Sequence, residues 1–146
     1  MIMRFAVVST SISLASTSTV IRLSLHILAA CVWLGGQIVL AGLLPTLRSL
    51  GPEAPRKVAQ TFGRLSWPAF WLLVLTGFWN YAAVHGASQS SSWTAVFALK
   101  MAMVVLAGVG AFAHTRASSP RARGASAGLS TLATVTAMVL GVVISG

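Results

Sequence analysis

The sequence predicts an all-α integral membrane protein, folded as a four-helix up-and-down bundle. Of its 146 residues, 56% are hydrophobic and only 8% are charged, with ten Lys and Arg against a single acid, Glu53. A soluble domain carries about 25% charged residues, and a disordered chain has far fewer apolar residues to keep in water. The connectors between the apolar runs are short, which forces neighbouring helices to run antiparallel.

Each apolar run is close to the roughly 20 residues that a helix needs to cross a bilayer. The expected spans lie at about 20–44, 65–84, 93–114 and 127–145. Pro45 lacks a backbone donor and is expected to end the first span. Pro68 is expected in the first turn of the second span, where a missing N–H costs little. The four spans together form one membrane domain over residues 20–146.

Residues 1–19 precede the first span and are expected to form an N-terminal tail or an interfacial segment. Their start, Met1 to Val8, is similar to a secretory signal, but its apolar stretch is short and a Ser- and Thr-rich stretch follows it. A cleaved signal is the alternative. The lone cysteine, Cys31, lies within an apolar run, so the chain has no disulfide framework of its own.

The basic residues gather in two connectors. The connector after the first span carries four Lys or Arg and the one after the third carries three, whereas the middle loop has none and the N-terminal side has Arg4 and Arg22. Short loops rich in Lys and Arg stay in the cytoplasm. We therefore expect a multi-pass protein of the bacterial cytoplasmic (inner) membrane with both termini outside. The net charge of +9 is then a topology signal, and no nucleic-acid partner is expected.

Two ionisable residues lie inside expected spans, where a charge is costly and marks a functional candidate. At 1.5 Å per residue, His26 lies about 9 Å and Lys100 about 10 Å below the outer ends of their helices. Because the first and third spans share their outer end, we expect both side chains in one polar pocket of the outer leaflet. The alternatives are that Lys100 snorkels to the surface and that His26 only bonds a neighbouring helix.

The remaining candidates follow from helical spacing. On the first span, a polar, small and aromatic stripe recurs every three or four positions, at Arg22, His26, Ala30, Trp33 and Gln37. The second span presents Gly77, Tyr81 and His85 as the corresponding stripe. The expected pocket residues are Arg22, Trp33, Gln37, Tyr81, Lys100 and Met138. Close helix packing is expected at the small residues Gly35, Gly36 and Gly108.

Three chemistries fit such a pocket. Imidazole and thioether groups are copper ligands, so His26 with Met101, Met103 or Met138 could bind copper. Alternatively, His26 could be an axial ligand of haem, with His85, Met103 or a neutral Lys100 opposite. The third is proton or anion handling, in which Lys100 and Arg22 attract a negative group such as a haem propionate.

A single acid excludes carboxylate pairs, EF-hands and acidic catalytic triads. The sequence therefore points away from an enzyme, and an enzymatic role would be that of a haem-dependent oxidoreductase.

The run LHILAACVWLGG, residues 25–36, resembles the first helix of the copper-resistance protein D (CopD) domain. That family places a histidine seven residues before a Trp-Leu-Gly-Gly type sequence, as His26 stands here before Trp33. Residues 67–77 and 97–100 look like its next two helices, and the resemblance extends over about residues 21–114.

The CopD resemblance implies a copper-handling membrane protein in which copper passes between periplasm and cytoplasm. His26 would be a metal ligand, Met103 or His85 would complete the coordination, and Lys100 would set the charge of the pocket. The implied partners are the lipid bilayer and a periplasmic copper carrier, together with further copies of the chain or a membrane-complex subunit.

A related group, the HemJ-type protoporphyrinogen oxidases, is similar in having an early-span histidine and a span-borne lysine, which match His26 and Lys100. That similarity implies haem b as the cofactor, although the group's Leu-Pro-Arg type segment is missing after Gly36. A third alternative is a structural or assembly subunit of a membrane complex.

Overall fold

Four long helices make up the structure, which is a computed structural model describing residues 14–145. The first is continuous over Thr17–Ser49, 33 residues, and consists of α1, a single π-helical turn and α2. The elements are α1 (Thr17–Ala30), the π-helical turn (Cys31–Gly35), α2 (Gly36–Ser49), α3 (Glu53–Ala83), a 3₁₀ turn (Gly86–Ser88), α4 (Ser91–Arg116) and α5 (Pro120–Val143). The all-α prediction is confirmed.

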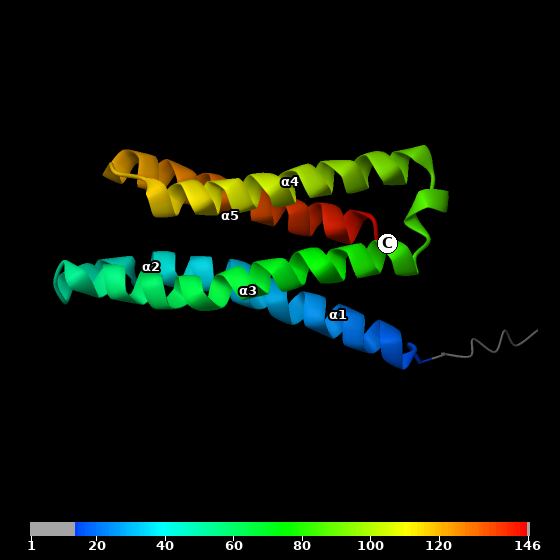
Figure 1. Cartoon of the computed structure of the whole chain (residues 1–146), viewed down its shortest axis with the longest axis horizontal. Helices are drawn as coiled ribbons and strands as arrows, with labels where there is room; N and C mark the ends of the chain where they lie inside the picture. Colours follow the sequence, from blue (N-terminus) through cyan, green and yellow to red (C-terminus); the bar gives the residue numbers. More distant parts are fainter. Residues whose placement is uncertain (1–13, 146) are drawn as a thin grey trace, which may run out of the picture.

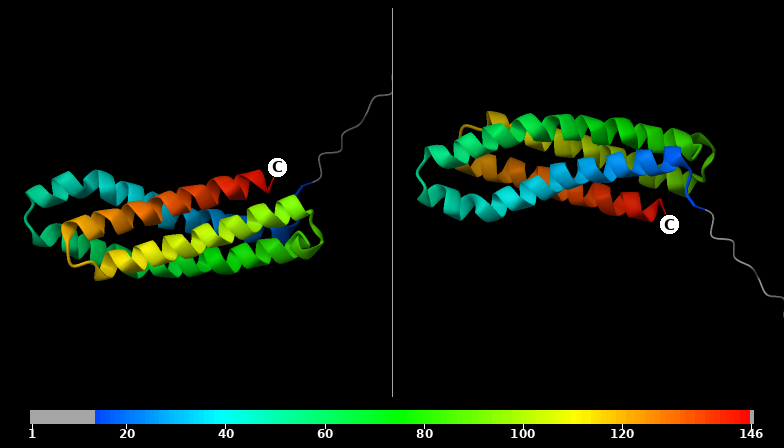
Figure 2. Two further views of the ribbon diagram at one scale, coloured as in Figure 1. Left: turned by 90° about the horizontal axis from the view of Figure 1, so that it is seen from above. Right: turned by 90° about the horizontal axis from the view of Figure 1, so that it is seen from below.

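The four helices run up and down as two antiparallel hairpins (Figure 1). The α1–α2 helix and α3 form one layer, and α4 with α5 forms the other; views from above and below show the same arrangement (Figure 2). The connections α2–α3 and α4–α5, which carry the basic residues, lie at one end of the bundle. The α3–α4 connection, the start of α1 and the end of α5 lie at the opposite end.

Three helices within residues 14–145 are long and apolar enough to cross a membrane: Thr17–Ser49, α4 and α5. The α3 helix, which contains the expected second span, is not among them. Three tryptophans, together with Asn80 and Tyr81, lie within the expected span 65–84 and reduce its hydropathy. The chain is therefore a small helical protein whose apolar helices are suited to a lipid bilayer.

The helices extend further into the polar connectors than the sequence pattern indicates. The first helix does not end at Pro45, which lies inside α2, and Pro68 lies in the middle of α3 instead of in a first turn. Each proline removes only one backbone hydrogen bond, and membrane helices tolerate this loss. The basic connector itself is mostly helical, because Arg, Lys, Gln and Ala are good helix formers.

Serine side chains cap the N-termini of three of the four long helices. Ser16 accepts a hydrogen bond from the backbone N–H of Thr19, Ser90 from that of Trp93, and Ser119 from that of Ala122. These N-caps satisfy donors that a helix start leaves unpaired.

The two hairpins are packed in different ways. Within the second, α4 and α5 approach closely: a Cβ added at Gly110 would lie 2.9 Å from the backbone nitrogen of Ser130. Between the hairpins, the ring of Phe70 on α3 fills the space beside Gly108 on α4. Of the three glycines predicted to pack helices, Gly108 and Gly36 face aromatic rings, whereas Gly35 has open space around it.

Replacement of Gly110 by alanine should destabilise the protein. The added methyl group meets the backbone of α5, which cannot rotate away as a side chain can, and overpacking of this kind costs about 1–3 kcal/mol. The measurement is thermal unfolding of the detergent-solubilised protein, followed by circular dichroism. Gly42→Ala is the matched control, because a Cβ at Gly42 meets nothing within 4 Å. Equal melting temperatures for both variants would contradict the close approach of α4 and α5.

Candidate functional site

The polar stripe of the first helix faces the interior along its whole length. Arg22 and His26 bond to α3, while Trp33 and Gln37 bond to α5. From Arg22 to Gln37 is slightly more than four turns of an ideal helix with 3.6 residues per turn. The π-helical turn Cys31–Gly35 takes up one extra residue, which keeps both ends of the stripe on the same face.

His26 is held by a threonine of the neighbouring helix. Its Nδ1 lies 2.7 Å from Oγ1 of Thr76, and that hydroxyl lies 2.6 Å from the carbonyl oxygen of Leu72 in its own helix. Since the hydroxyl has one proton and donates it to Leu72, the imidazole donates from Nδ1–H to Thr76. In the neutral imidazole, this network selects the tautomer in which Nε2 carries a free lone pair. No described residue forms a hydrogen bond with Nε2.

Arg22 lies one turn before His26 and is buried, with 7% of its surface exposed. Its Nη1 donates to Oδ1 of Asn80, which lies one turn after Thr76 on α3. The Nε of the guanidinium is buried without a hydrogen-bond partner among the described residues. A buried donor without a partner costs about 1–3 kcal/mol, and more when it is charged.

Lys100 approaches the same region from the diagonally opposite helix. Half-buried on α4, it places its Nζ 3.0 Å from the position that a Cβ of Gly141 on α5 would occupy. A larger residue than glycine there would displace the ammonium group. Lys100 is also close enough to His26 for its charge to act on the imidazole.

Below His26, the centre of the bundle is closed by aromatic rings. Trp33, 3% exposed, donates from its indole N–H to Oγ1 of Thr134 at 3.1 Å. Its ring centroid lies 4.7 Å from that of Phe70 and 5.8 Å from that of Trp67. One turn further, the Thr131 hydroxyl donates to Oε1 of Gln37 at 2.8 Å. Trp33 and Gln37 therefore tie the first hairpin to α5.

The other predicted residues lie in different surroundings. Tyr81 packs against Phe97 with ring centroids 4.6 Å apart, and it belongs to the aromatic contact between α3 and α4. Met103 is half-buried on α4, one turn below Lys100. Met138 is 50% exposed on the outside of α5. His85 is exposed in the α3–α4 loop, where it adopts a left-handed backbone conformation with φ 51°.

The sequence reasoning missed Thr76 as a partner of His26. The predicted stripe on the second span ran through Gly77 and Tyr81, one position away from the pair that faces α1. A signal was present: Thr76 and Asn80 are spaced four residues apart, as are Arg22 and His26. Two polar pairs with equal spacing on antiparallel helices can bond at successive turns.

The charged side chains of this region are all positive. Glu53, the one acidic residue of the sequence, starts α3 at the basic end, whereas Arg22 and Lys100 lie towards the other end. No acidic side chain of the chain is therefore available to neutralise them. Within residues 14–145, no three His, Cys, Asp or Glu side chains come together in a group that could hold a metal ion. The site offers a single free imidazole nitrogen beside two cations.

No protein-family model, curated protein or solved structure matches this chain.

The bond between Arg22 and Asn80 should contribute measurably to stability. In a double-mutant cycle of Arg22→Met and Asn80→Leu, we expect a coupling of about 1 kcal/mol, between the average of about 0.6 and the maximum of about 1.7 kcal/mol that such cycles give in a helical membrane protein. The measurement is the free energy of unfolding in mixed micelles. As a control, Gln37→Leu combined with Asn80→Leu should be additive within about 0.5 kcal/mol, because the two residues share no partner. A cycle that closes without coupling would show that Asn80 does not hold the guanidinium.

Proposed function

We propose that this chain is a multi-pass membrane protein that binds haem b, whose iron would be held by Nε2 of His26. The observation that carries the proposal is the combination of a free imidazole nitrogen with two uncompensated cations. Haem presents both matching features, a metal that accepts one imidazole and two propionate carboxylates that carry negative charge.

The state of His26 supports ligation. Histidines that bind a metal almost always donate their other ring N–H to a partner, which sets the tautomer and the ring orientation. Thr76 is such a partner for Nδ1–H.

Arg22 and Lys100 support an anionic group. A charge inside a membrane costs about 2.5–3.5 kcal/mol by insertion measurements, and no acidic side chain of the chain offsets it here. The buried Nε of Arg22 still has a proton to donate. Propionates would accept it and would neutralise both cations. Bound haem would supply one-electron chemistry, while Arg22 and Lys100 would orient it and offset its negative charge.

The positive charges of Arg22 and Lys100 make copper a less favourable ligand than haem at this site. A copper ion near His26 would be repelled by Lys100 and Arg22, and Met138 is turned outward. Met101 and Met103 remain the predicted thioether ligands that are half-buried near Lys100. The resemblance to HemJ-type proteins, with its matching His26 and Lys100, agrees with the haem proposal. The CopD resemblance keeps copper as the competing outcome.

The deciding experiment is the visible spectrum of the purified protein, before and after addition of haem. We expect a Soret band that is absent in His26→Ala and retained in His85→Ala, since His85 is exposed in a loop. Thr76→Val should weaken haem binding about 10–100-fold, the usual effect of losing the partner of a ligating histidine, and Thr76→Ser should restore it.

Helicity and melting temperature of each variant, measured without haem, separate loss of the ligand from loss of the fold. A protein with no Soret band that binds Cu(I) stoichiometrically through His26 would replace haem by copper. If neither ligand binds, the structural or assembly role is favoured.

We also propose that α3 is a fourth span and that both basic connections are cytoplasmic. The α3 helix runs antiparallel beside the first helix and over a comparable length (Figure 1). A membrane that the neighbouring helices cross would therefore surround α3 as well. In a Cys31→Ser background, Ser49→Cys, at the start of the connection before α3, should be protected from an impermeant thiol reagent in intact cells, whereas Ser88→Cys, after α3, should react. Labelling of both positions from the same side would contradict four spans.

A further inference from the structure

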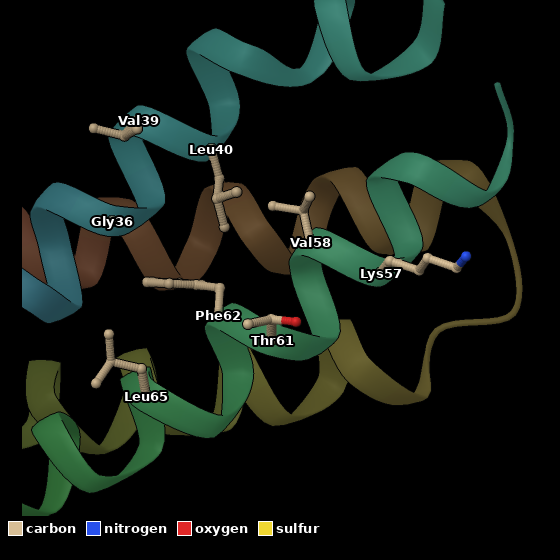
Figure 3. Close-up of a pocket in the computed structure, with 8 residues that line it drawn as sticks. All are labelled: Gly36, Val39, Leu40, Lys57, Val58, Thr61, Phe62 and Leu65. Atoms are coloured by element: carbon tan, nitrogen blue, oxygen red, sulfur yellow. The ribbon is translucent and has the colours of Figure 1, made fainter. Parts of the chain in front are cut away.

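A groove lies between α2 and α3 near the basic end of the bundle, remote from His26 (Figure 3). It encloses about 480 Å³, within the range of roughly 300–1,000 Å³ that is usual for small-molecule sites. Val39 and Leu40 line it from α2, and Val58, Phe62 and Leu65 line it from α3. Lys57 lies at its end, with the ammonium group directed away from the apolar side chains.

The groove has two chemically different ends. From Lys57 to Leu65 it follows about 12 Å of α3 at 1.5 Å per residue. Its apolar part includes Val39 and Leu65, which are 58% and 60% exposed and would face lipid tails. Its other end reaches the hairpin tip, where Arg48, Arg56 and Lys57 are exposed with Glu53 as the only acid. A charged end beside an apolar trough matches the polarity of a phospholipid.

We propose that this groove binds an anionic phospholipid, with one acyl chain along Leu40, Val58 and Phe62 and the phosphate group at Lys57. Charge selects this occupant. A second copy of the chain, related by an axis along the membrane normal, would bring the same basic hairpin tip to the same side and would be repelled. A zwitterionic lipid would gain less from the surplus of Lys and Arg at this end.

The test compares lipid binding by native mass spectrometry in neutral detergent, with phosphatidylglycerol and phosphatidylcholine of identical acyl chains as probes. Wild type should bind phosphatidylglycerol preferentially. Lys57→Gln should lower that binding about fivefold, the usual contribution of one basic residue near anionic lipid, and should leave phosphatidylcholine binding unchanged. Arg121→Gln is the matched control, because it removes the same charge from the exposed start of α5 at the same end of the bundle.

A second variant tests the apolar part of the groove. Val39→Trp should fill the trough from an exposed position and reduce the binding of both lipids, without lowering the melting temperature. Excess inorganic phosphate should not displace the lipid, since the acyl chain holds it in place. Equal losses in Lys57→Gln and Arg121→Gln, displacement by phosphate, or undiminished binding to Val39→Trp would each overturn the proposal.

Discussion

Two hydrogen bonds between α1 and α3 set the register on which the rest of the structure depends. Arg22 bonds to Asn80 and His26 to Thr76, at successive turns of two antiparallel helices. A shift of one turn would break both bonds and leave two charged or polar groups unpaired in an apolar interior, where such groups are costly. With this register, Trp33 comes level with Phe70, and the indole reaches Thr134 on α5.

The scarcity of acidic residues has a second consequence. Most membrane-buried cations are paired with a carboxylate or with backbone carbonyls, but this chain has one acid, and it lies at the opposite end of α3. Arg22 bonds to the neutral side chain of Asn80, and the ammonium group of Lys100 lies close to Gly141. The interior thus keeps a positive potential, which favours an anionic ligand over a free metal cation.

The bundle is divided along its length by the aromatic contacts of Trp33, Trp67 and Phe70. On one side lies the His26 region, with its single free imidazole nitrogen and two cations. On the other lies the basic hairpin tip, with the groove between α2 and α3. The aromatic layer separates the two regions, so a ligand bound in one would not contact residues of the other. Binding at the two places is therefore expected to be independent.

The sequence by itself determined the helical class, the two basic connectors and the inward stripe of the first helix, because hydropathy and a 3.6-residue period are local properties. It also singled out His26 and Lys100, since ionisable residues are rare in apolar runs. Only the tertiary structure decided that the helices continue through Pro45 and Pro68, and that Thr76 sets the tautomer of His26. It also turned Met138 outward. Such facts depend on the rotation and register of one helix against another, which arise from side-chain contacts between segments distant in the chain.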